Sequence, residues 1–257
     1  MAGLLGTGAG AVPPGFAVAD PHLHTTRSDG MVSPRELVRA AARAGLGVIC
    51  VTDHDTTAGV AEAGDAGAEF GVEVVAGEEV TTKAPGRVHV LGLFLDGPVR
   101  MGLTVADTIR AIRDRGGLAV LAHPFMPTYF ASITPAGLRR LIARERLDGI
   151  ELRHTSLTTR GRARALDAFY AANRDALGAA VGSSDSHFGG HDLARTVTAF
   201  PGLGAADFRR ALEAGLTRPI ERYAHPPAPA LQTRLRQQAR SLGWLSWQRW
   251  RGRVGQG

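Results

Sequence analysis

Short apolar runs alternate with amphipathic stretches along most of this chain, and this alternation limits its fold more than any other feature. The apolar runs are predicted strands, at residues 17–23, 47–52, 72–81, 87–94, 118–122, 148–152, 178–183 and 195–200. The amphipathic stretches between most of them are predicted helices, at residues 34–44, 58–70, 104–115, 135–145, 160–173 and 205–214. Repeated strand–helix units of this kind are typical of an α/β fold with a mainly parallel sheet.

Two of the predicted helices begin with residues that favour a first helical turn. Ser33 precedes Pro34 and Glu36, which is the order of an N-cap, a first-position proline and a capping-box glutamate. Thr134 and Pro135 open a later helix in the same way. We therefore expect both helices to begin at these prolines.

The length and composition suit one large folded domain. A chain of 257 residues matches a single α/β barrel of about 250 residues with an appendage. Residues 1–16 lack a basic start and carry only a weak apolar run, so we expect a flexible leader instead of a signal peptide. No stretch has the roughly 18 apolar residues of a membrane span. Cys50, the single cysteine, excludes an internal disulfide and is typical of a buried thiol, so we expect a cytoplasmic protein.

The positive charge is concentrated at one end of the sequence. The chain has 30 basic and 24 acidic residues, and its isoelectric point is about 10.5. Six of the arginines, and no acidic residue, follow residue 222, so residues 1–222 carry no net charge. A neutral body gives no electrostatic reason to expect a long nucleic acid as the partner.

Polar motifs stand at or just beyond the ends of the predicted strands. His22 and His24 lie two residues apart in "HLH", and side chains at that spacing in a strand leave from the same face. "SDSH" repeats the spacing with Asp185 and His187. The other strand ends carry "TDHD", "EE", "AHP" and "IELRH". Because α/β barrels place their chemistry at the carboxyl ends of their strands, these motifs predict a transition-metal site at one edge of the sheet.

In this order, the motifs "HLHTTRSDG", "TDHDT", "GEEV", "VHVLG", "AHP", "GIEL" and "SDSH" resemble those of the polymerase and histidinol phosphatase (PHP) family of metal-dependent phosphoesterases. The resemblance covers roughly residues 17–222. It implies a distorted (β/α)7 TIM-like barrel, the PHP fold, here with a short basic C-terminal tail over residues 223–257. The segment "HPPAPA" at 225–230 is typical of a linker.

The resemblance also implies a ligand set for two or three divalent ions, which the mixed nitrogen and oxygen donors suit as Mn, Fe or Zn. One ion would take His22, His24, Glu79 and Asp185; a second would share Glu79 and add His89 and His123; a third would take Asp29, His54 and His187. One aspartate of "TDHD" is expected to orient an imidazole. The family's glutamate is the second residue after the glycine, which selects Glu79 over Glu78.

The rim of the barrel offers weaker candidates. His154 is a possible rim acid or substrate contact, and Glu151, Arg153 and Arg195 are possible substrate-binding residues. Some family members carry a long insertion with substrate-binding arginines before the "AHP" motif. Only one predicted helix, 104–115, occupies that place here, so the resemblance does not identify the substrate.

The expected reaction is hydrolysis of a small phosphorylated substrate, such as a nucleotide or a sugar or amino-alcohol phosphate, by a metal-bound hydroxide. One alternative is a 5′–3′ exonuclease on short oligonucleotides. Another is a metal-dependent hydrolase of a non-phosphate ester or carbamate. A non-catalytic barrel, like those inside some polymerases, is disfavoured because every ligand position holds a competent residue.

The basic tail has a feature of its own. Trp244, Trp247 and Trp250 recur every third residue, so on a helix the three indoles form one stripe. Such a stripe suits packing on the barrel or on a second subunit. It also suits an anionic membrane surface, with tryptophans at the interface and arginines toward the headgroups, or less well a nucleic acid.

Overall fold

The computed structural model describes residues 10–84, 86–126, 131–155, 159–222 and 229–254, and within the last helix it describes side chains only up to residue 244 and at Ser246. Most of the predicted leader's residues, 1–9, and residues 223–228, which include most of the predicted linker, lie outside the described part. The strands are β1 (Phe16–Asp20), β2 (Val48–Val51), β3 (Glu73–Thr81), β4 (His89–Leu93), β5 (Leu118–Leu121), β6 (Gly149–His154), β7 (Ala179–Ser183), β8 (Thr196–Pro201) and β9 (Arg218–Glu221). The helices are α1 (Pro34–Arg43), α2 (Val60–Phe70), α3 (Val105–Asp114), α4 (Pro135–Ile142), α5 (Arg160–Ala172), α6 (Arg174–Leu177), α7 (Ala205–Glu213) and α8 (Leu231–Val254), with a 3₁₀ turn at Gly189–His191.

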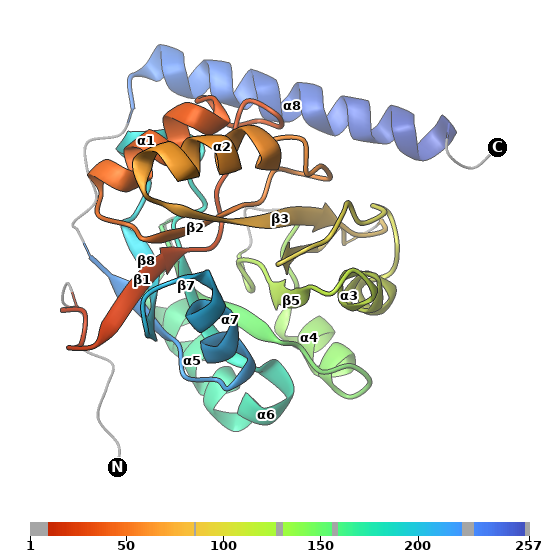
Figure 1. Cartoon of the computed structure of the whole chain (residues 1–257). Coiled ribbons are helices and arrows are strands. Elements are labelled where there is room, and N and C mark those ends of the chain that lie inside the picture. Colours follow the sequence, from red (N-terminus) through yellow and green to blue (C-terminus); the bar gives the residue numbers. More distant parts are fainter. Residues whose placement is uncertain (1–9, 85, 127–130, 156–158, 223–228, 255–257) are drawn as a thin grey trace.

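The strands form one curved sheet in the order β7-β6-β5-β4-β3-β2-β1-β8-β9, with helices on its outside (Figure 1). The neighbouring pairs β1–β2, β2–β3, β5–β6 and β6–β7 are parallel. The pairs β3–β4, β4–β5, β1–β8 and β8–β9 are antiparallel. The expectation of a mainly parallel sheet was therefore wrong, because β4 returns directly beside β3 without an intervening helix.

The two ends of the sheet meet and nearly close a barrel. The Thr198 hydroxyl on β8 donates to the Gly182 carbonyl on β7, with 2.7 Å between the oxygens, and accepts from the Gly182 N–H at 3.0 Å. A Cβ on Gly182 would lie 2.5 Å from the Val197 carbonyl oxygen. Glycine at this position therefore allows the two strands to approach.

Side chains along a strand point alternately to the two faces of the sheet, so the apolar core has one part inside the barrel and another between the sheet and the helices. Val48 and Cys50 of β2 belong to an apolar cluster inside the barrel, whereas Ile49 and Val51 pack in the cluster under α1 and α2. All four side chains are buried because the sheet is covered on both faces. Cys50 is buried, so the prediction of a buried thiol is confirmed, and burial raises the pKa of this thiol well above its usual value.

The two predicted helix starts agree with the structure, but two short elements were not predicted. Ser33 caps α1 in a capping box with Glu36, and Thr134 caps α4. The predicted strand and helix ranges otherwise agree with the structure to within a few residues, but β9 and α6, each only four residues long, were not predicted. Elements this short leave too little sequence to show a period.

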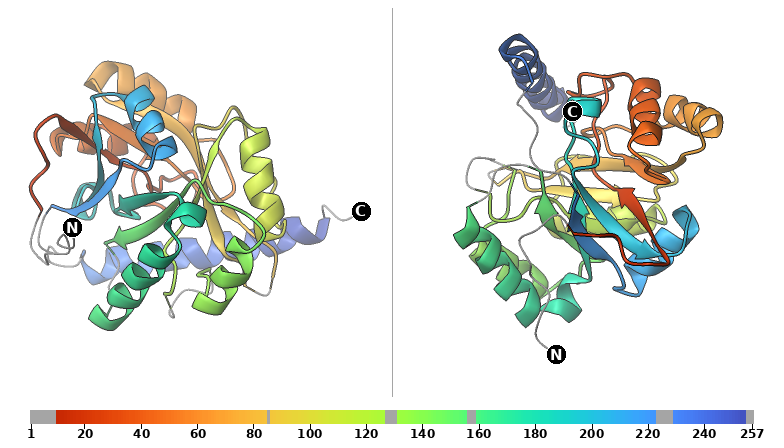
Figure 2. Two further views of the ribbon diagram at one scale, coloured as in Figure 1. Left: turned by 90° about the horizontal axis from the view of Figure 1, so that it is seen from below. Right: turned by 90° about the vertical axis from the view of Figure 1, so that its left-hand side faces the viewer.

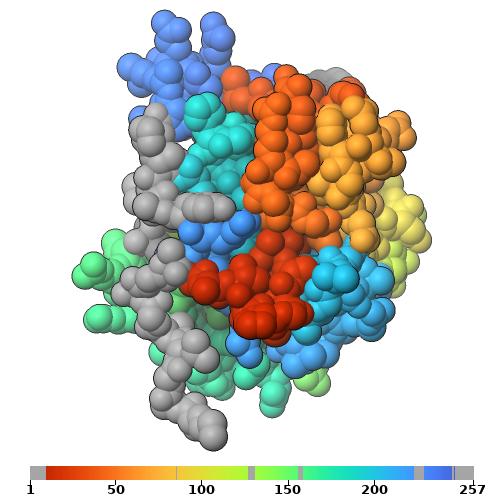
Figure 3. Space-filling model, turned by 60° about the vertical axis from the view of Figure 1, so that its left-hand side comes forward, coloured from red at the N-terminus to blue at the C-terminus, as the bar shows by residue number. Residues whose placement is uncertain are grey.

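Helix α8 lies apart from the barrel's helical layer. It runs along one side of the molecule, where it contacts the loop at residues 26–29, and the right-hand view of Figure 2 looks nearly along its axis. In the space-filling view it stands above the neighbouring surface (Figure 3). Among the described residues, no helix is both long enough and apolar enough to cross a bilayer.

Candidate metal centre

The structure gathers the predicted ligands into one cluster at the barrel mouth. Imidazole nitrogens and carboxylate oxygens approach one another at distances of 2.7–3.8 Å throughout the cluster. Its members are His22, His24, Asp29, His54, Glu79, His89, His123, Asp185 and His187. All nine positions are thus brought together, although they come from segments spread across the whole barrel sequence.

The HxH motif keeps its predicted geometry beyond the end of its strand. β1 ends at Asp20, and a single parallel bridge between Leu23 and Ser186 keeps the following backbone extended. Leu23 is fully buried in the apolar core under α1, while His22 and His24 turn the other way and bring their Nε2 atoms to 3.1 Å. Spacing i and i+2 therefore places both imidazoles on one face, as predicted.

Glu79 stands between two groups of histidines. Its Oε2 lies 3.1 Å from His22 Nε2 and 3.2 Å from His24 Nε2. Its Oε1 lies 2.7 Å from His89 Nδ1 and 3.0 Å from His123 Nε2. A carboxylate whose two oxygens face different imidazole pairs has the arrangement needed to bridge two cations.

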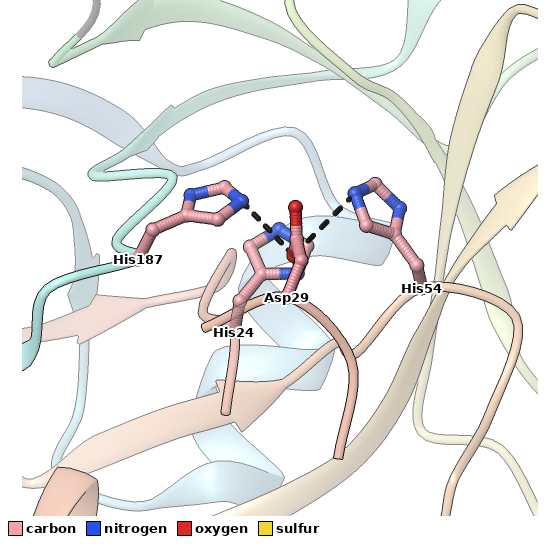
Figure 4. Close-up of side chains that lie close together, drawn as sticks. All are labelled: His24, Asp29, His54 and His187. Atoms are coloured by element: carbon pink, nitrogen blue, oxygen red, sulfur yellow. Dashed lines mark ion pairs between the residues drawn. The ribbon is translucent and has the colours of Figure 1, made fainter. Parts of the chain in front are cut away.

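A second carboxylate organises the other side of the cluster (Figure 4). Asp29 Oδ1 lies 3.2 Å from His187 Nε2, 3.8 Å from His54 Nε2 and 3.7 Å from His24 Nδ1. These four residues offer ligand atoms within 4.8 Å of one another. His54 also places Nδ1 3.1 Å from Glu79 Oε2, so it lies between the two carboxylates.

Two site residues have a backbone conformation that the sequence did not indicate. Asp185 has φ 51° and His123 has φ 27°, and both values lie in the left-handed region that non-glycine residues rarely adopt. Asp185 thereby brings Oδ1 to 3.4 Å from His22 Nε2 and 3.3 Å from His24 Nε2. The "SDSH" segment therefore reaches the cluster through a turn and not through a continuing strand.

Burial and the close approach of carboxylates and imidazoles shift the pKa values in the cluster. Burial raises the pKa of Glu79, but the surrounding imidazoles, His89 foremost, outweigh burial and hold it well below its usual value. Burial lowers the pKa of His187, yet the Asp29 carboxylate raises it to about 10. Burial lowers the pKa of His54 to about 3, despite the nearby carboxylates. The carboxylates are thus ionised, and His54 is a neutral nitrogen donor at neutral pH.

The donor set fits divalent cations. The buried nitrogens His24 Nδ1, His54 Nδ1 and His89 Nδ1 have no hydrogen-bond partner within the described part of the chain. Imidazole and carboxylate donors suit first-row transition ions, and a bound cation would compete with protons for these nitrogens. His54, His89 and His187 keep 13%, 13% and 17% of their side-chain surface exposed, so the cluster opens to solvent on their side.

Glu151 lies behind the cluster and not on a substrate-facing rim. It is fully buried, and its Oε1 accepts from His22 Nδ1 at 2.9 Å and from the Ser183 hydroxyl at 2.5 Å. Its Oε2 accepts from the His123 backbone N–H at 2.6 Å. The sequence-based suggestion that Glu151 binds substrate is therefore corrected, because protein groups surround both of its oxygens.

Asp53 of "TDHD" holds a loop instead of an imidazole. It accepts from the Thr25 backbone N–H at 2.8 Å, the Thr25 hydroxyl at 2.6 Å and the Ser28 hydroxyl at 2.6 Å. Gly30, at the end of the loop, packs against the backbone of His24 at its start: a Cβ on Gly30 would lie 2.5 Å from the His24 carbonyl oxygen. Glu151, far away in the sequence, orients the imidazole of His22.

The remaining rim candidates divide into two groups. The His154 ring stands edge-on to His123 with 6.3 Å between centroids, so it borders the cluster. Arg153 instead pairs with Asp167 on the outer helix α5, at 2.8 and 2.9 Å. Arg195 donates to the His191 carbonyl oxygen. The structure does not bring these two arginines to the cluster.

Comparison with known proteins gives matches over the N-terminal half. Residues 20–143 match the family model of the PHP domain. An uncharacterized protein of Methanocaldococcus jannaschii is 37% identical over 120 residues, which cover 42% of this chain and 68% of that protein.

Other relatives carry the names of enzymes, among them a nuclease and a phosphatase. A 5′-3′ exoribonuclease of Haemophilus influenzae is 37% identical over 102 residues, which cover 39% of this chain and 37% of the relative. A 3′,5′-nucleoside bisphosphate phosphatase of Chromobacterium violaceum is 41% identical over 102 residues, covering 38% of this chain and 34% of the relative. The aligned stretch spans only about a third of either enzyme.

A solved structure shares the fold over most of the chain. It is a two-domain protein of Bacteroides vulgatus containing a predicted PHP-like metal-dependent phosphoesterase. The TM-score is 0.68 at 22% identity, and the match covers 87% of this chain and 70% of that one. At 22% identity this similarity shows a shared fold and no more.

Proposed function

The chain belongs to the PHP family of metal-dependent phosphoesterases, and from that premise we propose that it hydrolyses a small phosphorylated substrate at the barrel mouth. The metal ligands are the nine clustered residues, in the grouping that the family resemblance implies. The observation that carries the proposal is Glu79, whose two carboxylate oxygens face separate groups of histidines. A bridging carboxylate of this kind suits a centre with two or three divalent ions.

The protein's own groups prepare this centre. When bound, divalent cations activate water and offset the negative charge on the transferred phosphoryl group. Glu79, Asp185 and Asp29 supply permanent negative charge, since the pKa of each lies well below its usual value where neighbouring imidazoles outweigh burial. Glu151 fixes the His22 ring, and the protein excludes water from the back of the cluster.

His154 is the proposed contact for the leaving group. Its ring borders His123 at the mouth and carries a ring nitrogen that can exchange a proton with a departing oxygen. Burial lowers the pKa of His154, and the adjacent Glu151 opposes that shift. Its place on β6, beyond Glu151, supports a role at the edge of the centre and not in holding a cation.

The substrate class is the finer part of the proposal. The neutral body and the similarity to a nucleoside bisphosphate phosphatase both support a small phosphate ester. A second candidate is a 5′–3′ exonuclease acting on short oligonucleotides. The similarity to an exoribonuclease and the acid-free, arginine-rich α8 beside the Asp29 loop favour it.

One experiment separates these candidates. The protein loaded with Mn²⁺ or Zn²⁺ is assayed against nucleoside bisphosphates, sugar phosphates and 5′-labelled oligonucleotides of two to ten nucleotides. The proposal predicts turnover of the small phosphate esters that a chelator abolishes and added cation restores. Turnover only of oligonucleotides would favour the exonuclease, and turnover of none of these substrates would contradict both.

A further inference from the structure

One face of α8 is turned toward the barrel, and it is largely polar. Thr233, Gln237, Ser241 and Trp244 are partly buried, whereas most of the described side chains between them are exposed. Spacings of four, four and three residues place these side chains on one side of a helix. The predicted tryptophan stripe contributes Trp244 to this face, and the side chains of the other two tryptophans lie outside the described part.

The contact reaches a predicted metal ligand directly. The Ser241 hydroxyl donates to Asp29 Oδ2, with 2.5 Å between the oxygens. Gln237 Nε2, one turn earlier, donates to the same hydroxyl oxygen at 2.9 Å and so orients it. Asp29 Oδ1 faces His187 and His54 on the other side. The two oxygens of one carboxylate therefore divide between the cluster and α8.

A neighbouring residue fixes the loop that carries this carboxylate. Arg240 donates through one terminal nitrogen to the Thr26 carbonyl at 3.0 Å and the Ser28 carbonyl at 3.1 Å. Asp53 holds the same loop from the barrel side through the Ser28 hydroxyl. The loop is thus held between the barrel and a helix more than 200 residues later in the chain.

We propose that Ser241 is a positioning residue for Asp29, and that docking of α8 is coupled to cation binding at Asp29, His54 and His187. This inference rests on the proposed function only in requiring that the cluster bind divalent cations. A cation held by Oδ1 and a hydroxyl held by Oδ2 both favour the same orientation of the carboxylate. Each event therefore strengthens the other, and by thermodynamic linkage the two effects are equal in size.

The chain contains its own reporter for this coupling. All three tryptophans of the protein belong to α8, so fluorescence excited selectively at tryptophan reports on this helix alone. Zn²⁺ is a suitable probe because its filled d shell leaves it without redox chemistry. Acrylamide quenching of the tryptophans is measured while the metal-free, full-length protein is titrated with Zn²⁺. We expect quenching to fall as Zn²⁺ binds.

Point variants then test the role of the hydroxyl. Ser241→Ala should weaken one class of Zn²⁺ sites by about tenfold, within the range seen when partners of a metal ligand are removed. Ser241→Thr keeps the hydroxyl and should restore both the affinity and the fluorescence response. Gln237→Ala should weaken binding in the same direction by a smaller factor. Arg236→Ala removes an arginine from the exposed side of the same helix and should change neither quantity.

The outcomes distinguish this inference from the proposed function. If the wild type binds Zn²⁺ and hydrolyses phosphate esters, while Ser241→Ala binds Zn²⁺ with unchanged affinity, the coupling is refuted and the proposed function stands. If acrylamide quenching of the tryptophans does not change with Zn²⁺ although calorimetry shows that Zn²⁺ binds, the coupling is also refuted. A wild type that binds no divalent cation overturns both.

Discussion

Glu151 and His22 form a fully buried pair, with 2.9 Å between Glu151 Oε1 and His22 Nδ1. Because an ionised carboxylate only accepts hydrogen bonds, the proton of this pair sits on Nδ1. His22 Nε2 is then the nitrogen directed at Glu79 and Asp185, where a cation is proposed to bind. Carboxylates that orient an imidazole in this way also increase its strength as a ligand.

Replacing Glu151 should therefore weaken cation binding without removing a ligand. Glu151→Gln keeps the size of the side chain and one acceptor oxygen but loses the negative charge. We expect a loss of about 10–100-fold in cation affinity, measured by calorimetric titration. Glu213→Gln, an exposed change on α7, is the matched control. An affinity equal to that of the control would show that Glu151 does not orient His22.

The bridging role assigned to Glu79 can be tested against its neighbour. Glu79→Gln removes the charge that faces both groups of histidines, so we expect the variant to bind fewer cations at two sites. Turnover should fall by more than about 100-fold, which is the upper range when a residue that only supports a metal ligand is removed. Glu78→Gln should be mild, since within the described part of the chain Glu78 Oε2 accepts from the Val99 backbone N–H at 2.8 Å and from no other group. Metal analysis and turnover are measured together. A larger loss of cations and turnover in Glu78→Gln than in Glu79→Gln would mean that Glu78, and not Glu79, is the bridging residue on β3.

Glu78 also predicts how stability depends on pH. Burial raises the pKa of Glu78 from 4.5 to about 8, with the Val99 hydrogen bond opposing the rise. Between these two values the folded state keeps a proton that the unfolded state has lost, so the free energy of unfolding falls as pH rises toward 8. Each pKa unit corresponds to about 1.4 kcal/mol.

Glu78→Gln should remove this pH dependence. The amide cannot ionise, so the variant should gain stability relative to the wild type from pH 5 to pH 8 and show no further gain above about pH 8. Urea unfolding of both metal-free proteins at several pH values measures the difference. A constant difference across this window would contradict the burial of an ionisable Glu78.

Removing the HxH pair should empty part of the centre. In the variant carrying both His22→Ala and His24→Ala, we expect loss of at least one bound cation per chain and no detectable turnover. The fold should persist, as judged by circular dichroism, because Leu23 between them continues to fill the core. His191→Ala, at an exposed histidine outside the cluster, is the control. Unchanged metal content in the double variant would exclude these residues as ligands.

The sequence by itself determined the type of chemistry and most of the elements. Period-two alternation placed Val48 and Cys50 on one face of β2, and the same rule placed His22 and His24 together. These are local relationships, because a strand repeats every two residues whatever surrounds it. The nine proposed ligand positions followed from motifs at strand ends and from the family resemblance.

The tertiary structure alone decided which partners hold those ligands. Glu151 meets His22 across 129 residues, and Ser241 meets Asp29 across 212. The left-handed backbone of Asp185 and His123 and the antiparallel return of β4 also depend on distant neighbours. Residue spacing carries information about faces within one element, whereas contacts between elements arise only when the barrel closes and α8 docks beside it.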